Sequence, residues 1–457
     1  MTRSQSNSNN NKRKLRIKNP QYDYYNDEEK AYYKALDVGK QQDIALMENN
    51  IIFANNRLIP LRFQVLESGV DENTRAIAIQ KIDHLYHMDP SGDEYHKIMH
   101  WVEAVCRVPF GKYCPLPITK TSSLPEIKQF ITNIKETMDS KVFGHESAKD
   151  HIVRLLAQWI SNPESKGLVI GIQGSMGTGK TTLVKDAICK VLGLPFAMIP
   201  LGGVNDGAFL VGHSYTYTGS TWGRIVDMLI KCKCMNPVVF FDELDKVSTT
   251  RNGEEIINIL IHMTDATQND SFQDKYFTNI EFDLSRSLIV FSYNNEDNIN
   301  PILRDRMIKI KTDGYKMSDK VTIAKRHLIP TILTEFGYGC DDVVFGDDVL
   351  KQIVQKVKDE EGVRNFKRAL HDIVSNLNLV KLLSTDDVVT DGIDVTDVTD
   401  ATDATDTTNA SMSSTNTNRA HAHVHAHAIP VTVTETHVKL YVNDSKKDNT
   451  SHLAMYS

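Results

Sequence analysis

The sequence predicts an α/β fold in which a parallel β-sheet is flanked by helices. The prediction depends on three short runs of residues, 168–172, 238–241 and 288–291, which alternate with helical segments. Each run is almost continuously apolar, as is typical of central strands in a parallel sheet that is covered on both faces. A glycine-rich turn links the first run to the next helical segment, which is the usual order of elements in such folds.

The composition changes several times along the 457 residues, and these changes predict the domain organisation. The expected parts are a disordered basic leader (1–20), a helical N-terminal region (21–135), a large α/β subdomain (136–314), a small and mostly helical subdomain (315–384), a disordered insertion (385–428), a segment that completes the small subdomain (429–443) and a tail (444–457). Within 429–443 we expect a strand followed by a short capped helix.

The leader and the insertion are biased in composition. Residues 1–20 carry six positive charges and no acid. We expect a solvated disordered arm, with contact to nucleic acid or a nuclear address as the alternative. In the insertion, Asp recurs at every third position from Asp391 to Asp406, and His alternates with small residues from His421 to His427. Neither tract can bury a core, although alternating imidazoles offer a weaker alternative as metal ligands.

The overall composition excludes several classes of protein. Apolar residues make up 40% and charged residues 24% of the chain, as in ordinary globular proteins. No window approaches the roughly 20 apolar residues that a membrane-spanning helix needs, and the N-terminus has no apolar core of a secretory signal. The six cysteines contain no CxxC pair. We therefore expect reduced thiols, no membrane association and a cytoplasmic location, with the nucleus as the alternative.

A glycine-rich octet predicts a nucleotide site. It follows the first predicted strand and opens a helix, and its residues are Gly174, Ser175, Met176, Gly177, Thr178, Gly179, Lys180 and Thr181. The glycines allow successive backbone N–H groups to surround a phosphate, and the helix N-terminus adds partial positive charge. Lys180 is expected to reach the β- and γ-phosphates, and the Thr181 hydroxyl to join a Mg²⁺ shell. The cofactors predicted are therefore ATP and Mg²⁺.

Polar residues at the ends of the other two predicted strands complete this site. Asp242 and Glu243 follow the second strand, where an acidic pair is costly unless a cation or substrate meets it. We expect Asp242 to hold Mg²⁺, partly through water, and Glu243 to act as the general base toward the attacking water. The third strand leads into Asn294 and Asn295, and an amide at this point is suited to orient that water.

Taken together, these residues resemble the ATPase module of Lon, the ATP-dependent protease of the AAA+ class. The resemblance covers roughly residues 65–385 and resumes over 429–443, so the biased tracts look like an insertion within the small subdomain. Beyond the nucleotide motifs it is carried by Phe143-Gly144-His145, Leu201-Gly202-Gly203-Val204, Gly212-His213, Leu303-Arg304-Asp305-Arg306-Met307 and Gly362-Val363-Arg364.

The resemblance implies further roles. Asn295 matches the residue called sensor 1, with Asn294 left open as the alternative. Arg306 matches the arginine finger that acts on ATP in a neighbouring subunit, which implies a homo-oligomeric ring, in this family a hexamer. Arg364 matches sensor 2, which contacts the γ-phosphate. Tyr217 falls at the position of the pore-loop aromatic that grips a polypeptide substrate.

The sequence also departs from the family pattern. Ser175 and Met176 stand where the family usually has prolines, a change that we expect to be neutral because the phosphate cradle uses backbone N–H groups. Trp222 replaces the usual proline after the pore loop, which leaves the geometry of the grip open. The chain ends shortly after Val442, near the expected start of the family's serine–lysine peptidase domain, and residues 22–64 are too short for its N-terminal substrate-recruiting domain. We therefore expect no peptidase activity in this chain.

The function expected is that of an ATP-dependent protein unfoldase, which hydrolyses Mg-ATP in a ring and threads polypeptide through it. One alternative is an ATPase partner of a separate peptidase. Another is a nucleic-acid-associated remodeller or scaffold that uses the basic leader, which would bind DNA in a salt-sensitive way.

Overall fold

The computed structural model describes most of the chain, which folds as two compact units. The described residues are 22–54, 59–119, 121–162, 168–217, 219–248, 250–339, 341–357, 359–383 and 431–442. The first unit contains the described parts of 1–113 together with 208–235 and 273–282, and the second contains the rest. The predictions for the basic leader, the Asp and His tracts and the tail therefore lie outside the described residues.

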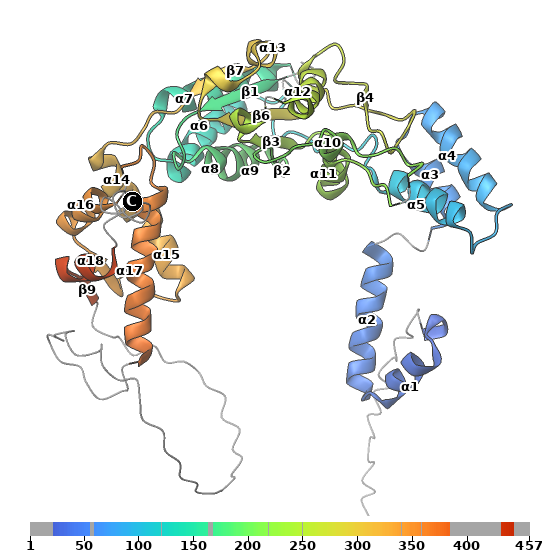
Figure 1. The fold of residues 1–457 in the computed structure, drawn as a ribbon, viewed down its shortest axis with the longest axis horizontal. Helices are drawn as coiled ribbons and strands as arrows, with labels where there is room; N and C mark the ends of the chain where they lie inside the picture. The colour runs from blue at the N-terminus through green and yellow to red at the C-terminus, as the bar shows by residue number, and fades with distance from the viewer. Residues whose placement is uncertain are drawn as a thin grey trace, which may run out of the picture. The chain divides into compact units, whose positions relative to one another are not determined.

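The second unit contains a parallel sheet with the strand order β2-β3-β6-β1-β7 (Figure 1). The strands are β1 (Val169–Gln173), β2 (Phe196–Pro200), β3 (Val238–Asp242), β6 (Leu288–Tyr293) and β7 (Ile308–Lys311). The three central strands are the three predicted runs, so the α/β prediction is confirmed. The edge strands β2 and β7 were not predicted, because exposed residues such as Met198 and Lys309 interrupt their apolar pattern.

Helices cover this sheet. They are α6 (Leu124–Lys141), α7 (Glu146–Ser161), the continuous segment α8 (Lys180–Thr182), η2 (Leu183–Ile188) and α9 (Cys189–Leu192), then α12 (Arg251–Thr264) and α13 (Pro301–Asp305), with short turns η3 (Leu244–Lys246) and η4 (Glu296–Asn298). One face of the sheet shares a buried core with α6, α7 and the helix after β1; its members include Ile134, Met138, Ile152, Leu156, Ile170, Ile172, Val184, Phe240 and Val290.

The position of α6 corrects one predicted boundary. The predicted limit between residues 135 and 136 cuts through this helix. Because Ile134 and Met138 are buried in the core beneath the sheet, α6 belongs to the second unit. The division between the units falls at Tyr113 and Cys114 instead.

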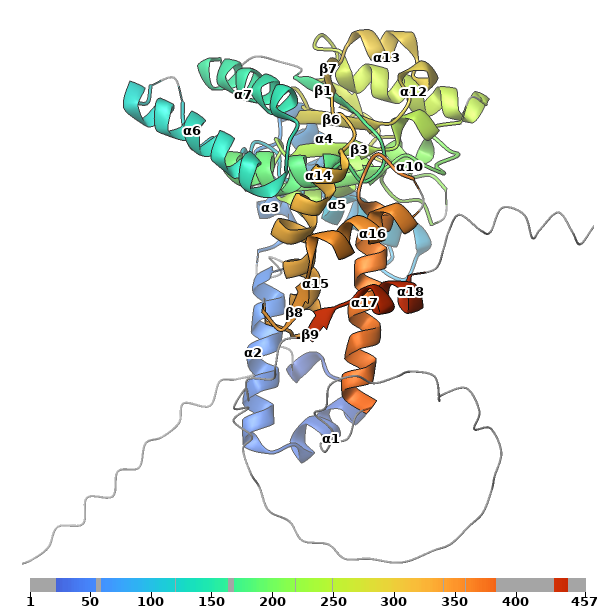
Figure 2. The same cartoon turned by 90° about the vertical axis from the view of Figure 1, so that its left-hand side faces the viewer.

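The small subdomain also lies in the second unit. It contains α14 (Met317–Ile323), η5 (Ala324–Leu328), α15 (Ile329–Glu335), β8 (Val343–Phe345), α16 (Asp347–Lys356), α17 (Arg364–Leu383), β9 (Val431–Val433) and α18 (Glu435–Tyr441). The predicted strand and short helix after the biased tracts are confirmed: β9 pairs in parallel with β8, and Thr434 is the N-cap of α18. Val433 and Val438 belong to the same buried core as Phe366 of α17. Figure 2 shows α18 beside α17. The chain on both sides of residues 384–430 therefore builds one subdomain.

The first unit is mainly helical. Its elements are η1 (Tyr22–Tyr24), α1 (Asp27–Ala35), α2 (Val38–Ala54), α3 (Leu61–Glu67), α4 (Glu72–Leu85), α5 (Asp93–Arg107), α10 (Ala208–Val211), α11 (Arg224–Cys232) and β5 (Glu281–Phe282), with β4 (Phe272–Gln273) at its limit. Segments 208–235 and 273–282, which we predicted as parts of the large subdomain, pack here through aromatic contacts. The buried Trp101 ring lies 6.1 Å from Phe277, and Phe110 stacks on Phe282 at 5.6 Å.

Trp222 belongs to the same aromatic cluster. Its ring stacks on His100 at 5.3 Å, and the His100 Nδ1 atom lies 2.8 Å from the Tyr276 hydroxyl. The resemblance led us to expect proline at this position, and here an indole packs against His100 of α5 instead.

The described residues contain neither a membrane-spanning helix nor a cluster of metal-ligating side chains. No helix among them is both long and apolar enough to cross a membrane. No group of three or more His, Cys, Asp or Glu side chains among them is arranged to hold a metal ion.

Candidate active site

The glycine-rich octet forms a turn that only glycine allows at several positions. Gly177 and Gly179 have φ values of +80° and +87°, which side chains rarely tolerate. A Cβ atom on Gly174 would lie 1.9 Å from the Thr312 hydroxyl. The chain then enters α8 at Lys180, directly after Gly179. Backbone N–H groups and a helix N-terminus therefore meet at one point, as anion binding requires.

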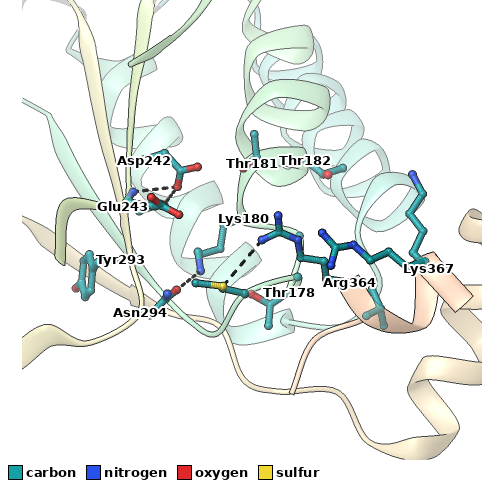
Figure 3. A pocket seen from close by; sticks show the side chains of 16 residues that line it. Thr178, Lys180, Thr181, Thr182, Asp242, Glu243, Tyr293, Asn294, Arg364 and Lys367 are labelled. Atoms are coloured by element: carbon teal, nitrogen blue, oxygen red, sulfur yellow. Dashed lines mark hydrogen bonds between the residues drawn. The ribbon is translucent and has the colours of Figure 1, made fainter. Parts of the chain in front are cut away.

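A cavity of about 500 Å³ opens at this turn, beyond the carboxyl ends of the central strands. Its lining residues are Met176, Gly177, Thr178, Gly179, Lys180, Thr181, Thr182, Asp242, Glu243, Ser292, Tyr293, Asn294, Val363, Arg364, Lys367 and Arg368. Figure 3 shows Lys180 directed toward Asn294, with the acidic pair on one side and Arg364 on the other. Segments far apart in sequence thus place both acidic and basic side chains around one cavity.

The Lys180 ammonium is held by polar oxygens. It donates hydrogen bonds to the carbonyl oxygens of Gly174 and Ser175, the latter at 3.1 Å, and to Asn294 Oδ1 at 3.0 Å. Burial lowers the pKa of Lys180, and the nearby carboxylates of Asp242, Asp245 and Glu243 oppose this shift. A partly desolvated ammonium in this position attracts an anion more strongly than one in water.

The acidic pair lies at the end of β3. The Asp242 carboxylate accepts hydrogen bonds from the Ser292 hydroxyl and, at 3.1 Å, from the backbone N–H of Glu243. Glu243 has a φ of +59°, which is uncommon for a residue with a side chain and turns the chain from β3 into η3. Asp242 and Thr181 both line the cavity. Oxygen ligands beside a phosphate cradle suit Mg²⁺, so these residues fit the predicted ion.

The structure corrects the choice between the two adjacent asparagines. Asn294 lines the cavity and accepts the hydrogen bond from Lys180. The Asn295 side chain instead accepts from the backbone N–H of Asp297 at 3.0 Å and caps η4. The amide that faces the phosphate cradle is therefore Asn294, because the side chains of successive residues at the end of β6 point in different directions.

Three basic residues of α17 reach the cavity, of which only Arg364 was predicted. Lys367 and Arg368 follow it at spacings of three and four, so all three share one face of the helix. That spacing was visible in the sequence and was the signal that could have identified them. Together the three side chains place positive charge opposite Asp242 and Glu243.

The turn before α17 packs directly on the phosphate cradle. The backbone N–H of Val363 donates to the Gly177 carbonyl at 3.2 Å, and the Ser175 hydroxyl donates to the Glu361 carboxylate. A Cβ atom on Gly362 would lie 2.1 Å from the Met176 carbonyl oxygen. The expectation that serine at position 175 is neutral therefore misses a hydrogen bond that joins the cradle to the small subdomain.

His145 supports the cradle from outside the cavity. Its Nε2 atom lies 3.1 Å from the Thr178 carbonyl oxygen and 2.9 Å from the Tyr315 hydroxyl, which itself donates to Thr178 at 2.9 Å. Burial lowers the pKa of His145, which favours the neutral imidazole. Sequence reasoning found this residue as part of the family resemblance but gave it no role.

Neither of the other two predicted residues is among those that line this cavity. Arg306 donates to the Asp265 carboxylate at 2.9 Å and to the Ile261 carbonyl oxygen, and it does not line the cavity of its own chain. Tyr217 lies in the loop between α10 and α11 in the first unit, where 68% of it is exposed.

Comparison with known proteins agrees with this arrangement. Residues 170–313 match the family model described as "ATPase family associated with various cellular activities (AAA)". The chain is 42% identical over 259 residues to the Lon protease homolog of Acanthamoeba polyphaga mimivirus. The matched region covers 56% of this chain and 25% of that protein.

Bacterial relatives match a longer part of the chain. It is 34% identical over 312 residues to the Lon protease of Desulfosudis oleivorans, covering 68% of this chain and 36% of the relative. It is 32% identical over 363 residues to the Lon protease of Koribacter versatilis, and this match covers 79% of this chain and 42% of the relative. The chain thus spans well under half the length of these relatives. It contains an AAA-family ATPase module that is related to the Lon proteases.

Proposed function

We propose that this chain is an ATP-dependent protein unfoldase that hydrolyses Mg-ATP in a homo-oligomeric ring and threads polypeptide through it. The observation that carries the proposal is the convergence of Lys180, Glu243, Asn294 and Arg364 on one cavity of about 500 Å³. These groups supply a phosphate contact, a carboxylate base, a water-orienting amide and a cation for the γ-phosphate.

The roles within one pocket follow from position. The cradle and Lys180 bind the triphosphate, and the Thr181 hydroxyl and Asp242 would hold Mg²⁺, which neutralises phosphate charge when bound. Glu243 takes a proton from the attacking water while Asn294 fixes the orientation of that water. Arg364, on the small subdomain, contacts the γ-phosphate and so links nucleotide state to the position of α17.

Two residues outside the pocket support the ring and the threading. Arg306 does not line its own chain's cavity, as expected of a side chain that completes a neighbour's site. Tyr217 presents an exposed aromatic ring on a loop, and such a ring can grip an extended polypeptide without reading its sequence. A ring of identical subunits, a hexamer by analogy with the family, places both residues in use at once.

The test is a substrate trap. Glu243→Gln should bind ATP, release phosphate at least about 100-fold more slowly than the wild type and retain its polypeptide clients. Tyr217→Ala should hydrolyse ATP but fail to unfold a tagged model protein, while Tyr217→Phe should unfold it. A Glu243→Gln variant that turns over ATP at the wild-type rate, or an active ATPase that never unfolds the tagged protein, would contradict the proposal.

The ring has its own test. Arg306→Ala alone should bind ATP but hydrolyse it slowly. Mixed with Glu243→Gln, it should regain part of the wild-type activity, because the Gln variant still supplies Arg306 to a neighbour whose Glu243 is intact. Absence of any recovery in oligomers that contain both variants would rule out action between subunits.

A second candidate function is supported by the names of the relatives, which are proteases. In this case the chain drives ATP-dependent proteolysis with a separate peptidase. Co-purification of a peptidase with the Glu243→Gln trap would favour this candidate over unfolding alone. For either function we propose a cytoplasmic location.

A further inference from the structure

Gly202 lies beside the proposed general base because neighbouring strands are in register. β2 and β3 pair with Pro200 opposite Asp242, and the backbone N–H of Leu201 donates to the Asp242 carbonyl at 2.9 Å. Glu243 follows Asp242 directly and Gly202 follows Leu201, so both residues lie just beyond the paired ends of the two strands.

The Glu243 side chain occupies the space that a side chain on Gly202 would need. A Cβ atom built on Gly202 would lie 1.9 Å from Glu243 Oε2, 3.1 Å from its Cδ and 3.4 Å from its Cβ. Gly202 itself does not have a positive φ, so alanine fits its backbone conformation. The space at this position, and not the flexibility of glycine, is what matters here.

Two features make this space specific to the base. Glu243 is fixed by its left-handed backbone, with a φ of +59° directly after the sheet, so its side chain leaves the chain in a set direction. The adjacent Gly203 has open space around its Cβ position, and nothing lies within 4 Å. Only the first glycine of the pair borders the carboxylate.

We propose that Gly202 is a positioning residue for catalysis, which leaves room for the Glu243 carboxylate at the place from which it reaches the attacking water. This inference rests on the proposed ATPase function. Alanine at position 202 pushes the carboxylate aside while the phosphate cradle and the Mg²⁺ ligands stay in place. A displacement of about 1 Å in a catalytic group can cost about 100-fold in rate.

The experiment compares Gly202→Ala with the wild type in phosphate release and in the affinity for ATP. We expect kcat to fall about 10- to 100-fold with the Kd for ATP unchanged. Gly346→Ala is the matched control, because its Cβ meets nothing within 4 Å and its φ is not positive. Its kcat should remain at the wild-type value.

A double variant distinguishes positioning from a general structural defect. Because Gly202 acts through Glu243, adding Gly202→Ala to Glu243→Gln should slow phosphate release no further. An unchanged or higher kcat in Gly202→Ala, an additional loss in the double variant, or weakened ATP binding would each overturn the inference. Lack of turnover in the assembled wild-type protein would instead overturn the proposed function from which the inference starts.

Discussion

Alanine substitutions at Asn294 and at Asn295, made separately, distinguish two adjacent amides with different surroundings. Asn294→Ala removes the acceptor that lies 3.0 Å from the Lys180 ammonium within the cavity. A hydrogen bond to a charged group contributes about 1.5–3 kcal/mol, and each 1.36 kcal/mol corresponds to a factor of about ten. We therefore expect kcat/KM for ATP to fall between about 10- and 150-fold.

Asn295→Ala should behave in the opposite way. Its side chain caps η4 by accepting from the Asp297 N–H at 3.0 Å, and loss of such a cap costs about 0.5–2 kcal/mol of unfolding free energy. The backbone N–H of Asn295, which donates to Asp245 at 3.2 Å, is retained in alanine. We expect lower stability and an unchanged kcat.

The assay pairs steady-state phosphate release, at limiting and saturating Mg-ATP, with urea unfolding of each variant. The two asparagines serve as controls for each other, since the chemical change is identical and the positions are adjacent. The reasoning is refuted if Asn295→Ala loses as much turnover as Asn294→Ala, or if Asn294→Ala keeps the wild-type kcat/KM.

Two further predictions concern the surroundings of the phosphate cradle. Gly362→Ala places a Cβ atom 2.1 Å from the Met176 carbonyl oxygen, so the backbone of the phosphate cradle must move. The affinity for ATP, measured by nucleotide titration, should therefore fall at least about tenfold. An unchanged affinity would contradict the packing of Gly362 on the cradle. Burial lowers the pKa of His145 below its ordinary 6.5, so the unfolded chain takes up a proton here at higher pH than the folded chain does. The resulting stability is fully present above about pH 6.5 and is lost as the pH falls through that value toward the folded pKa. His145→Asn is the comparison, because asparagine tolerates the same left-handed backbone. On acidification, the unfolding temperature measured by calorimetry should decline more steeply in the wild type than in this variant. Parallel curves would contradict a contribution of His145 to the pH dependence of stability.

Local patterns predicted the features that depend on neighbours in sequence. The central strands were recognisable because both faces of each strand are buried, and the cradle was recognisable because its glycines are closely spaced. The strand and the capped helix at 431–441 were also predicted from residues that are adjacent in sequence. The edge strands were missed because solvent on one side breaks their apolar pattern.

Features that depend on distant contacts were not accessible in this way. The assignment of 208–235 and 273–282 to the helical unit follows from ring contacts with the N-terminal region: Trp222 stacks on His100, Phe277 packs against Trp101 and Phe282 stacks on Phe110. The placement of α6 in the second unit likewise follows from its buried Ile134 and Met138. The apolar pattern within these segments does not indicate which other segment their buried side chains pack against.

The sequence by itself therefore determined the α/β class, the phosphate cradle and the acidic strand end, because each is encoded within a few consecutive residues. Only the tertiary structure decided that Asn294 rather than Asn295 faces Lys180, that Lys367 and Arg368 join Arg364 at the cavity, and that Gly202 borders Glu243. These decisions depend on side-chain direction at a strand end, on the face that a helix presents, and on register between strands. The spacing of the three basic residues shows in the sequence that they share a helix face, but which cavity that face meets depends on packing between segments far apart in the chain, as does the register of β2 against β3.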